Sequence, residues 1–329
     1  MENTVYNLKQ PRKAFSRIGF ALSTIVAVAF AAQFALIYIP RWIWGNDNWL
    51  DTTSWGFWIK SLVPMYVFAF PAGWLVMRKM PTHAPERHNL TFGKGILLFF
   101  IAQFIMYAGN IIGNLSAMIL SGGKAQNAIA EYAMDTNPLK ILVMVILAPL
   151  FEEFVFRKLL IDRTRAYGEK AAVFFSAITF GLLHQNFFQF FYAFGVGFAF
   201  AYIYVRTGKL RYTVIMHAVV NFMGAVIAPW IISQLDLNAL MSGAMTEAEM
   251  MKVYADILPG LMLYLLYAFF LLGSAVTGLV LFIVFFKRFI WKWTEWQLPK
   301  NTAFKTIYIN AGVILFVVIC LIFMVISLF

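Results

Sequence analysis

The sequence predicts an all-α, polytopic membrane helical bundle with about eight or nine transmembrane helices. Three observations predict this class: a very high apolar content, a series of apolar runs long enough to cross a bilayer, and basic residues gathered between alternate runs. Of the 329 residues, 62% are hydrophobic and only 12% are charged, and the mean hydropathy is +0.76. A soluble domain of this length could not bury so much apolar surface.

Nine apolar runs approach the roughly 20 residues that a membrane-spanning helix needs. They cover residues 18–39, 55–77, 95–120, 139–161, 171–188, 190–206, 211–232, 258–286 and 304–328. The fifth and sixth runs are short, and only Gln185, Asn186 and Gln189 separate them. Either of these two could therefore form a re-entrant loop.

The basic residues predict how the runs are oriented. If the N-terminus is cytoplasmic, all of the 26 Lys and Arg residues except Arg41, Lys60, Lys124, Lys140 and Lys252 fall on the inner side. This is the positive-inside pattern of membrane proteins. It also accounts for the net charge of +11, so we expect membrane lipid, and no nucleic acid, as the partner of these clusters.

The spans suggest three parts: residues 1–138 with about three spans, a helical core at 139–232, and an external loop with the last spans at 233–329. Residues 289–296 place three tryptophans among basic residues, which predicts an interfacial helix on the inner side. In residues 233–256, Thr246 and Glu249 have the spacing of a capping box, which predicts a short external helix.

Two carboxylates stand side by side within the fourth run, at Glu152 and Glu153. A carboxylate at membrane depth is costly and is a functional candidate by default. Arg157 lies one helical turn after Glu153 and can neutralise it. Glu152 projects about 100° away from Glu153 around the helix and has no partner in its own run. Glu152 is therefore the candidate for chemistry, and Glu153 and Arg157 form a supporting pair.

Two of the four histidines also lie inside apolar runs. His184 closes the sequence Phe180-GLL-His184 in the fifth run, and His217 opens His217-AVV-Asn221 in the seventh. The four-residue spacing places His217 and Asn221 on one helical face. We expect these groups and Glu152 to surround one water-accessible cavity, because none could face lipid at low cost.

The depth of these groups suggests how the cavity is reached. They lie roughly 9 to 18 Å from the inner ends of their helices, which suggests access from the cytoplasmic side. Asn110 and Asn114 share a face of the third run. They could line the same cavity or tether neighbouring helices.

Such a group of side chains can activate water. A carboxylate paired with a histidine can take a proton from water, and a second histidine and an amide can donate to the oxyanion formed on a carbonyl. Peptide-bond hydrolysis fits these parts. A zinc site built from Glu152, His184 and His217 is the alternative, but H-E-x-x-H is lacking and Asn221 is a poor zinc ligand. We expect neither a metal nor another cofactor.

The three motifs, in this order, resemble the CPBP family of intramembrane proteases, also called the Abi or CAAX-protease family. The family pattern is E-E-x-x-x-R, F-x-x-x-H and H-x-x-x-N/D, and residues 139–232 match it at every motif position. The resemblance implies a helical intramembrane glutamic endopeptidase with a four-helix catalytic core. In it Glu152 would be the catalytic carboxylate, and His184 would help it to activate water. His217 and Asn221 would stabilise the oxyanion, supported by Glu153 and Arg157.

The resemblance also suggests substrates and partners. Eukaryotic relatives trim the last three residues from prenylated CAAX proteins, and bacterial relatives are linked to peptide maturation, bacteriocin self-immunity and signalling. We expect a bacterial plasma-membrane enzyme with a membrane-associated or hydrophobic peptide or protein substrate. Some members lack the motifs and act as scaffolds, so a non-proteolytic regulator that binds a partner membrane or cell-envelope protein stays open. A proton-relay transporter is a third hypothesis.

Overall fold

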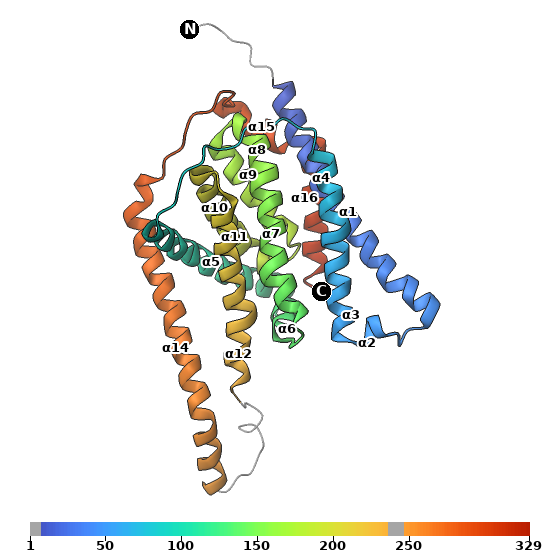
Figure 1. Cartoon of the computed structure of the whole chain (residues 1–329), viewed down its shortest axis with the longest axis vertical. Coiled ribbons are helices and arrows are strands. Elements are labelled where there is room, and N and C mark those ends of the chain that lie inside the picture. The colour runs from blue at the N-terminus through green and yellow to red at the C-terminus, as the bar shows by residue number, and fades with distance from the viewer. Residues whose placement is uncertain (1–7, 236–246) are drawn as a thin grey trace.

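The computed structural model describes residues 8–235 and 247–329, which form helices and connections without a strand (Figure 1). The N-terminal part contains α1 (Lys9–Trp44), α2 (Trp49–Thr52), α3 (Ser54–Leu62), the π-helical η1 (Val63–Ala69), α4 (Phe70–Met77), α5 (Phe92–Ser121) and α6 (Ala128–Met134). The C-terminal part contains α14 (Glu247–Phe285), η6 (Phe286–Arg288), α15 (Lys300–Tyr308) and α16 (Ala311–Ile326).

The middle part carries the candidate site. Its first helical stretch is continuous from residue 141 to 164 and consists of η2 (Ile141–Leu147), α7 (Ala148–Glu153), η3 (Phe154–Ile161) and α8 (Asp162–Thr164). The chain then turns through η4 (Arg165–Tyr167). It continues in α9 (Glu169–Leu183), α10 (Phe187–Thr207), α11 (Leu210–Phe222), η5 (Met223–Ile227) and α12 (Ala228–Ser233).

The length and apolar character of its helices identify this as an integral membrane protein. Six are long and apolar enough to cross a membrane: α1, the continuous helix Ser54–Met77, α5, α10, the continuous helix Leu210–Ser233, and Met250–Arg288. The pair α15 and α16, bent by 62°, gives a seventh if it counts as one span. The fourth expected span is helical but carries five charged residues, and α9 has only 15 residues. At 1.5 Å per residue α9 is about 22 Å long, short of the roughly 30 Å hydrocarbon core.

Two sequence predictions outside the core need correction. Residues 289–296 do not form an interfacial helix, because their backbone groups bind elsewhere. The Lys292 amide donates to Glu169 Oε1 (3.0 Å), and the Trp296 amide donates to the Ala166 carbonyl (3.1 Å). The predicted external helix is not separate either: Glu247 begins α14, a single helix of 39 residues. Thr246 lies outside the described residues.

Close packing of α5 against α10 brings α5 to the site. A Cβ atom at Gly109 would lie 2.6 Å from the Phe191 carbonyl oxygen, and one at Gly113 would lie 2.7 Å from the Phe187 carbonyl oxygen. The glycines thus let the two backbones approach, as small residues do between membrane helices. On the other side of the site, a buried apolar cluster joins α1, α4, η3, α9 and α16, and it includes Phe156 and Phe180.

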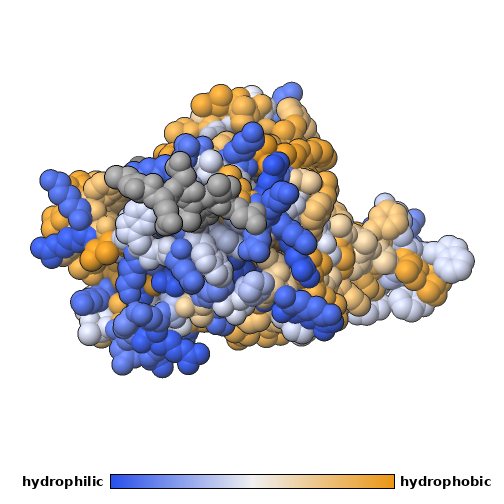
Figure 2. All heavy atoms as spheres, turned by 90° about the horizontal axis from the view of Figure 1, so that it is seen from above, coloured by the Kyte–Doolittle hydropathy of each residue, from blue (hydrophilic) through white to orange (hydrophobic). Residues whose placement is uncertain are grey.

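The end of the bundle at which α1 begins carries many hydrophilic side chains. Viewed onto this end, hydrophilic side chains gather across it and hydrophobic ones lie around the rim (Figure 2). Exposed basic residues of the clusters expected on the inner side include Arg12, Lys13, Arg17, Arg78, Lys79 and Lys170. Their cytoplasmic orientation stays a prediction.

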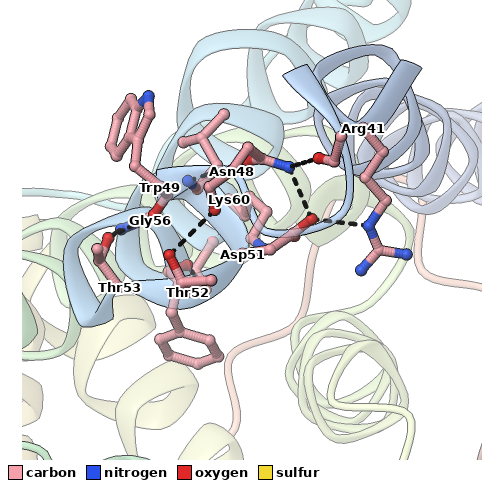
Figure 3. A network of polar contacts seen from close by, with 12 residues as sticks. Arg41, Asn48, Trp49, Asp51, Thr52, Thr53, Gly56 and Lys60 are labelled. Atoms are coloured by element: carbon pink, nitrogen blue, oxygen red, sulfur yellow. Dashed lines mark hydrogen bonds and ion pairs between the residues drawn. The ribbon is translucent and has the colours of Figure 1, made fainter. Parts of the chain in front are cut away.

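A polar network fixes the connection between α1 and α3 (Figure 3). Asp51 of α2 accepts from Arg41 Nε (2.7 Å), Lys60 Nζ (2.7 Å) and Asn48 Nδ2 (3.0 Å). The side chain of Asp51 is only 9% exposed. The hydrogen bonds from Arg41 and Lys60 hold the pKa of Asp51 well below its usual range.

This network predicts a pH-dependent stability. A carboxyl group whose pKa is lowered on folding stabilises the protein above its unfolded pKa, about 3.9, and the contribution is lost as the pH falls toward the folded value. The melting temperature of the wild type should therefore exceed that of Asp51→Asn at neutral pH, and the difference should shrink below about pH 4. A difference that stays constant over the same pH series would contradict this account.

Candidate active site

A fully buried ion pair forms the base of the site. Glu153 and Arg157 have no exposed side-chain surface and make two parallel hydrogen bonds, from Nε to Oε2 (2.9 Å) and from Nη2 to Oε1 (3.0 Å). Arg157 Nη1 donates to Ser176 Oγ of α9 (2.9 Å), and that hydroxyl donates to the Phe156 carbonyl (2.8 Å). The pair thereby joins the helical stretch 141–164 to α9.

His217 bridges the two neighbouring carboxylates. Its Nδ1 lies 3.2 Å from Glu153 Oε1. Because an ionised carboxylate only accepts, Nδ1 carries the hydrogen and Nε2 is the bare nitrogen of the neutral ring. Nε2 lies 3.9 Å from Glu152 Oε2, too far for a direct hydrogen bond. A single water molecule could contact both atoms.

Phe180 positions the histidines and the arginine around it. Its ring lies 5.0 Å from the Arg157 guanidinium carbon, close enough for a cation–π contact. The rings of His184 and His217 meet it edge-on, at centroid distances of 5.0 and 6.0 Å. The Phe180 carbonyl lies 2.9 Å from His184 Nδ1, so Nδ1 donates and leaves Nε2 bare in the neutral ring.

The turn after α9 holds His184 at the cavity. Gln185 adopts a left-handed backbone conformation (φ 57°), which is uncommon for a residue other than glycine. Asn186 then caps α10 by accepting from the Gln189 amide (2.8 Å), and it also donates to the His184 carbonyl (2.7 Å). The polar residues between the fifth and sixth apolar runs therefore build a tight turn.

Asn221 lies on the same helix as His217 and is held by the helical stretch 141–164. Its Nδ2 donates to the Met144 carbonyl (2.7 Å) in the π-helical η2. A side-chain amide has two N–H groups and an acceptor oxygen, so one N–H and the oxygen stay available to a ligand.

These groups line one cavity of about 600 Å³. The described lining includes every candidate that the sequence placed in direct contact with a ligand: Glu152, His184, His217 and Asn221, together with Phe180 and Asn110. Glu152 is 18% exposed, whereas Glu153 and Arg157 lie behind the lining. Asn114 is not among the lining residues. It is exposed and donates to Asn110 Oδ1 (3.1 Å).

The cavity extends away from the expected cytoplasmic side. Its lining continues to Asn127 and to Ala130 and Ala133 of α6, and α6 lies at the end of the bundle opposite the N-terminus (Figure 1). Access from the cytoplasmic side, which helix depth suggested, stays a prediction.

Sequence reasoning missed two residues near the site. Ser176, the partner of Arg157, lies four residues before Phe180 and eight before His184, so its helical spacing could have identified it. Gln103 on α5 also lines the cavity. It lies seven residues, about two helical turns, before Asn110 in the same apolar run, so helical spacing could have identified it as well.

A metal site receives no support from the arrangement of side chains. Within the ranges that the structure describes, no three His, Cys, Asp or Glu residues lie close enough together to hold one ion. The expectation that the protein works without a metal or cofactor stays a prediction.

Residues 135–223 match the family described as type II CAAX prenyl endopeptidase Rce1-like, and this segment contains Glu152, His184, His217 and Asn221. Residues 135–223 belong to the CPBP family. The matched CPBP segment lies largely within the core expected at 139–232.

A curated relative agrees with this assignment. The chain is 24% identical over 214 residues to "Putative membrane peptidase YdiL" of Bacillus subtilis (strain 168). The aligned region covers 61% of this chain and 85% of the relative. No solved structure matches the chain significantly. At the level of the family, the protein is a membrane protease.

Proposed function

We propose that this protein is an intramembrane glutamic endopeptidase that hydrolyses a peptide bond in a membrane-associated or hydrophobic substrate. One observation carries the proposal: of two adjacent carboxylates, Glu153 is bound by Arg157 and His217, while Glu152 faces the cavity beside His217 Nε2 without a hydrogen-bond partner among the described residues. A free carboxylate beside a bare imidazole nitrogen is suited to bind and deprotonate water.

In the proposed reaction, water attacks the carbonyl carbon of the scissile bond while Glu152 takes its proton. The oxyanion that forms accepts a hydrogen bond from the free N–H of Asn221. The proton then passes to the leaving nitrogen as the C–N bond breaks, which yields one new carboxylate and one new amine. His184 Nε2 faces the same cavity and assists this proton transfer.

The proposed setting is the bacterial plasma membrane, with the N-terminus in the cytoplasm. The positive-inside distribution of basic residues supports that orientation. Cysteine accessibility labelling of intact cells at Lys13→Cys and Lys124→Cys would check it, because only position 124 should react from outside.

A survey of peptide termini tests the proposed function. Cells carrying wild type or Glu152→Gln at matched membrane abundance are compared by quantitative terminus profiling. We expect new termini with wild type only, because an amide cannot take the proton of water. If the termini match while the cellular phenotype survives in the variant, the protein acts as a scaffold for a membrane or cell-envelope partner.

A further inference from the structure

A chain of hydrogen bonds runs from the turn after α9 to Tyr192 of α10. Asn186 Oδ1 accepts from the Gln189 backbone amide (2.8 Å), and Asn186 Nδ2 donates to the His184 carbonyl (2.7 Å). These two backbone groups fix which end of the Asn186 amide is the donor. The same Nδ2 donates to Gln189 Oε1 (2.7 Å), so Gln189 presents Nε2 to the Tyr192 hydroxyl (2.8 Å). The Tyr192 oxygen is therefore an acceptor in this chain.

The chain leaves the hydroxyl hydrogen of Tyr192 uncommitted. A phenol has one hydrogen to donate in addition to its acceptor oxygen. Because the oxygen accepts from Gln189, the hydrogen must point to another group, and within residues 8–235 and 247–329 no acceptor takes it. Tyr192 is partly exposed and lines the same cavity as Glu152. Its O–H is thus available to a ligand in that cavity.

Tyr192 is held close to the reacting groups. Its ring centroid lies 6.5 Å from that of His184, and its hydroxyl interacts electrostatically with the Glu152 carboxylate. The approach of α5 fixes the backbone at this point, since a Cβ atom at Gly109 would lie only 2.6 Å from the Tyr192 Cα. The hydroxyl is therefore preorganised beside the carboxylate.

The proposed reaction has room for a second hydrogen-bond donor to the oxyanion. Asn221 offers one N–H, because its other N–H is bound to the Met144 carbonyl. Preorganised donors that face the oxyanion lower the barrier to acyl transfer, and each is worth a large factor in rate. The bond from Gln189 Nε2 polarises the Tyr192 phenol and strengthens its O–H as a donor.

We infer that Tyr192 is a catalytic residue whose O–H donates to the oxyanion of the scissile carbonyl, together with the N–H of Asn221. This inference rests on the proposed function and adds a residue to it. As the water oxygen bonds to the carbonyl carbon, the π electron pair moves to the carbonyl oxygen and Glu152 takes the proton of water. Tyr192 keeps its hydrogen throughout, and its hydrogen bond weakens again when the carbonyl re-forms and the C–N bond breaks. Gln189 acts as a positioning residue.

The test compares wild type, Glu152→Gln, Tyr192→Phe and Tyr267→Phe, each purified at full length in nanodiscs of phosphatidylethanolamine and phosphatidylglycerol. The probe is a mixture of N-acetylated decapeptides randomised over uncharged residues, with amidated and with free C-termini. Mass spectrometry follows initial rates over a series of concentrations and gives apparent kcat and KM. Tyr267 is the matched control, because it lines the same cavity but its hydroxyl already donates to the Met223 carbonyl (3.1 Å).

Tyr192→Phe should lower kcat about 10²–10³-fold, the range for loss of one oxyanion donor. KM should change little, because the hydrogen bond is stronger to the oxyanion than to the ground-state carbonyl. The ring is retained, so the variant should accumulate in the membrane like wild type. Tyr267→Phe should keep a kcat near that of wild type. As a second variant, Gln189→Leu keeps the phenol but removes the group that orients it, and should lower kcat by a smaller factor.

The outcomes separate the two claims. If Glu152→Gln abolishes cleavage while Tyr192→Phe keeps the wild-type kcat, the proposed function stands and this inference is wrong. A rise in KM at unchanged kcat, or an equal loss of kcat in Tyr267→Phe, would also overturn it. If Tyr192→Phe loses kcat while Glu152→Gln cleaves like wild type, the inference stands and the role of Glu152 is refuted. If wild type cuts none of the peptides, both claims fail.

Discussion

Arg157→Leu is expected to destabilise the protein by about 3–5 kcal/mol, because it leaves the carboxylate of Glu153 buried without its cation. Both side chains are fully buried, so water cannot replace the lost partner. The variant should accumulate poorly in the membrane and melt at a lower temperature than wild type. Thermal unfolding of the detergent-purified protein measures the loss.

A double variant tests whether the loss of stability comes from the unpaired charge of Glu153. Glu153→Gln combined with Arg157→Leu removes the buried charge together with its partner, while the amide oxygen can still accept from His217 Nδ1. Most of the stability should return, since removing both charges of a buried pair is often tolerated. Arg157→Leu that melts like wild type, or a double variant no better than the single, would contradict the structural role of this pair.

His217→Gln is expected to lower the rate of hydrolysis by about 10²–10⁴-fold, the range typical for loss of a general acid or base. Glutamine can still donate to Glu153, so the variant should accumulate normally. His217 is the histidine whose Nε2 lies 3.9 Å from Glu152, and His184 has no described contact with that carboxylate. His184→Gln should therefore have the smaller effect. A larger effect at His184 would contradict the assignment of His217 as the nearer partner of Glu152.

The sequence alone predicts the membrane class and most of the candidate site, because isolated polar groups in apolar runs are costly and therefore informative. It cannot predict how the helices rotate against one another. The contact of His217 with Glu153 joins residues 64 positions apart, and it depends on the packing of α11 against α7. For the same reason, the sequence could not show that His217 lies next to Glu152.

The remaining differences between the sequence predictions and the structure arise where individual hydrogen bonds override the local preference of the sequence for a helix. Residues 289–296 have the composition of an interfacial helix, but the buried carboxylate of Glu169 accepts the Lys292 amide and helps hold the segment in an irregular conformation. The fifth apolar run continues past residue 184 in hydropathy, but the turn at Gln185 and the cap at Asn186 end α9.

The central claim is that Glu152 activates water, and the most direct measurement is hydrolysis of a pool of N-acetylated, C-terminally amidated decapeptides of uncharged residues by purified wild type and Glu152→Gln in nanodiscs. Melting temperatures of the two proteins must first be shown to agree, so that a loss of rate reflects chemistry. The account predicts cleavage by wild type and none above background by Glu152→Gln. Cleavage by the variant at a rate near that of wild type would contradict it.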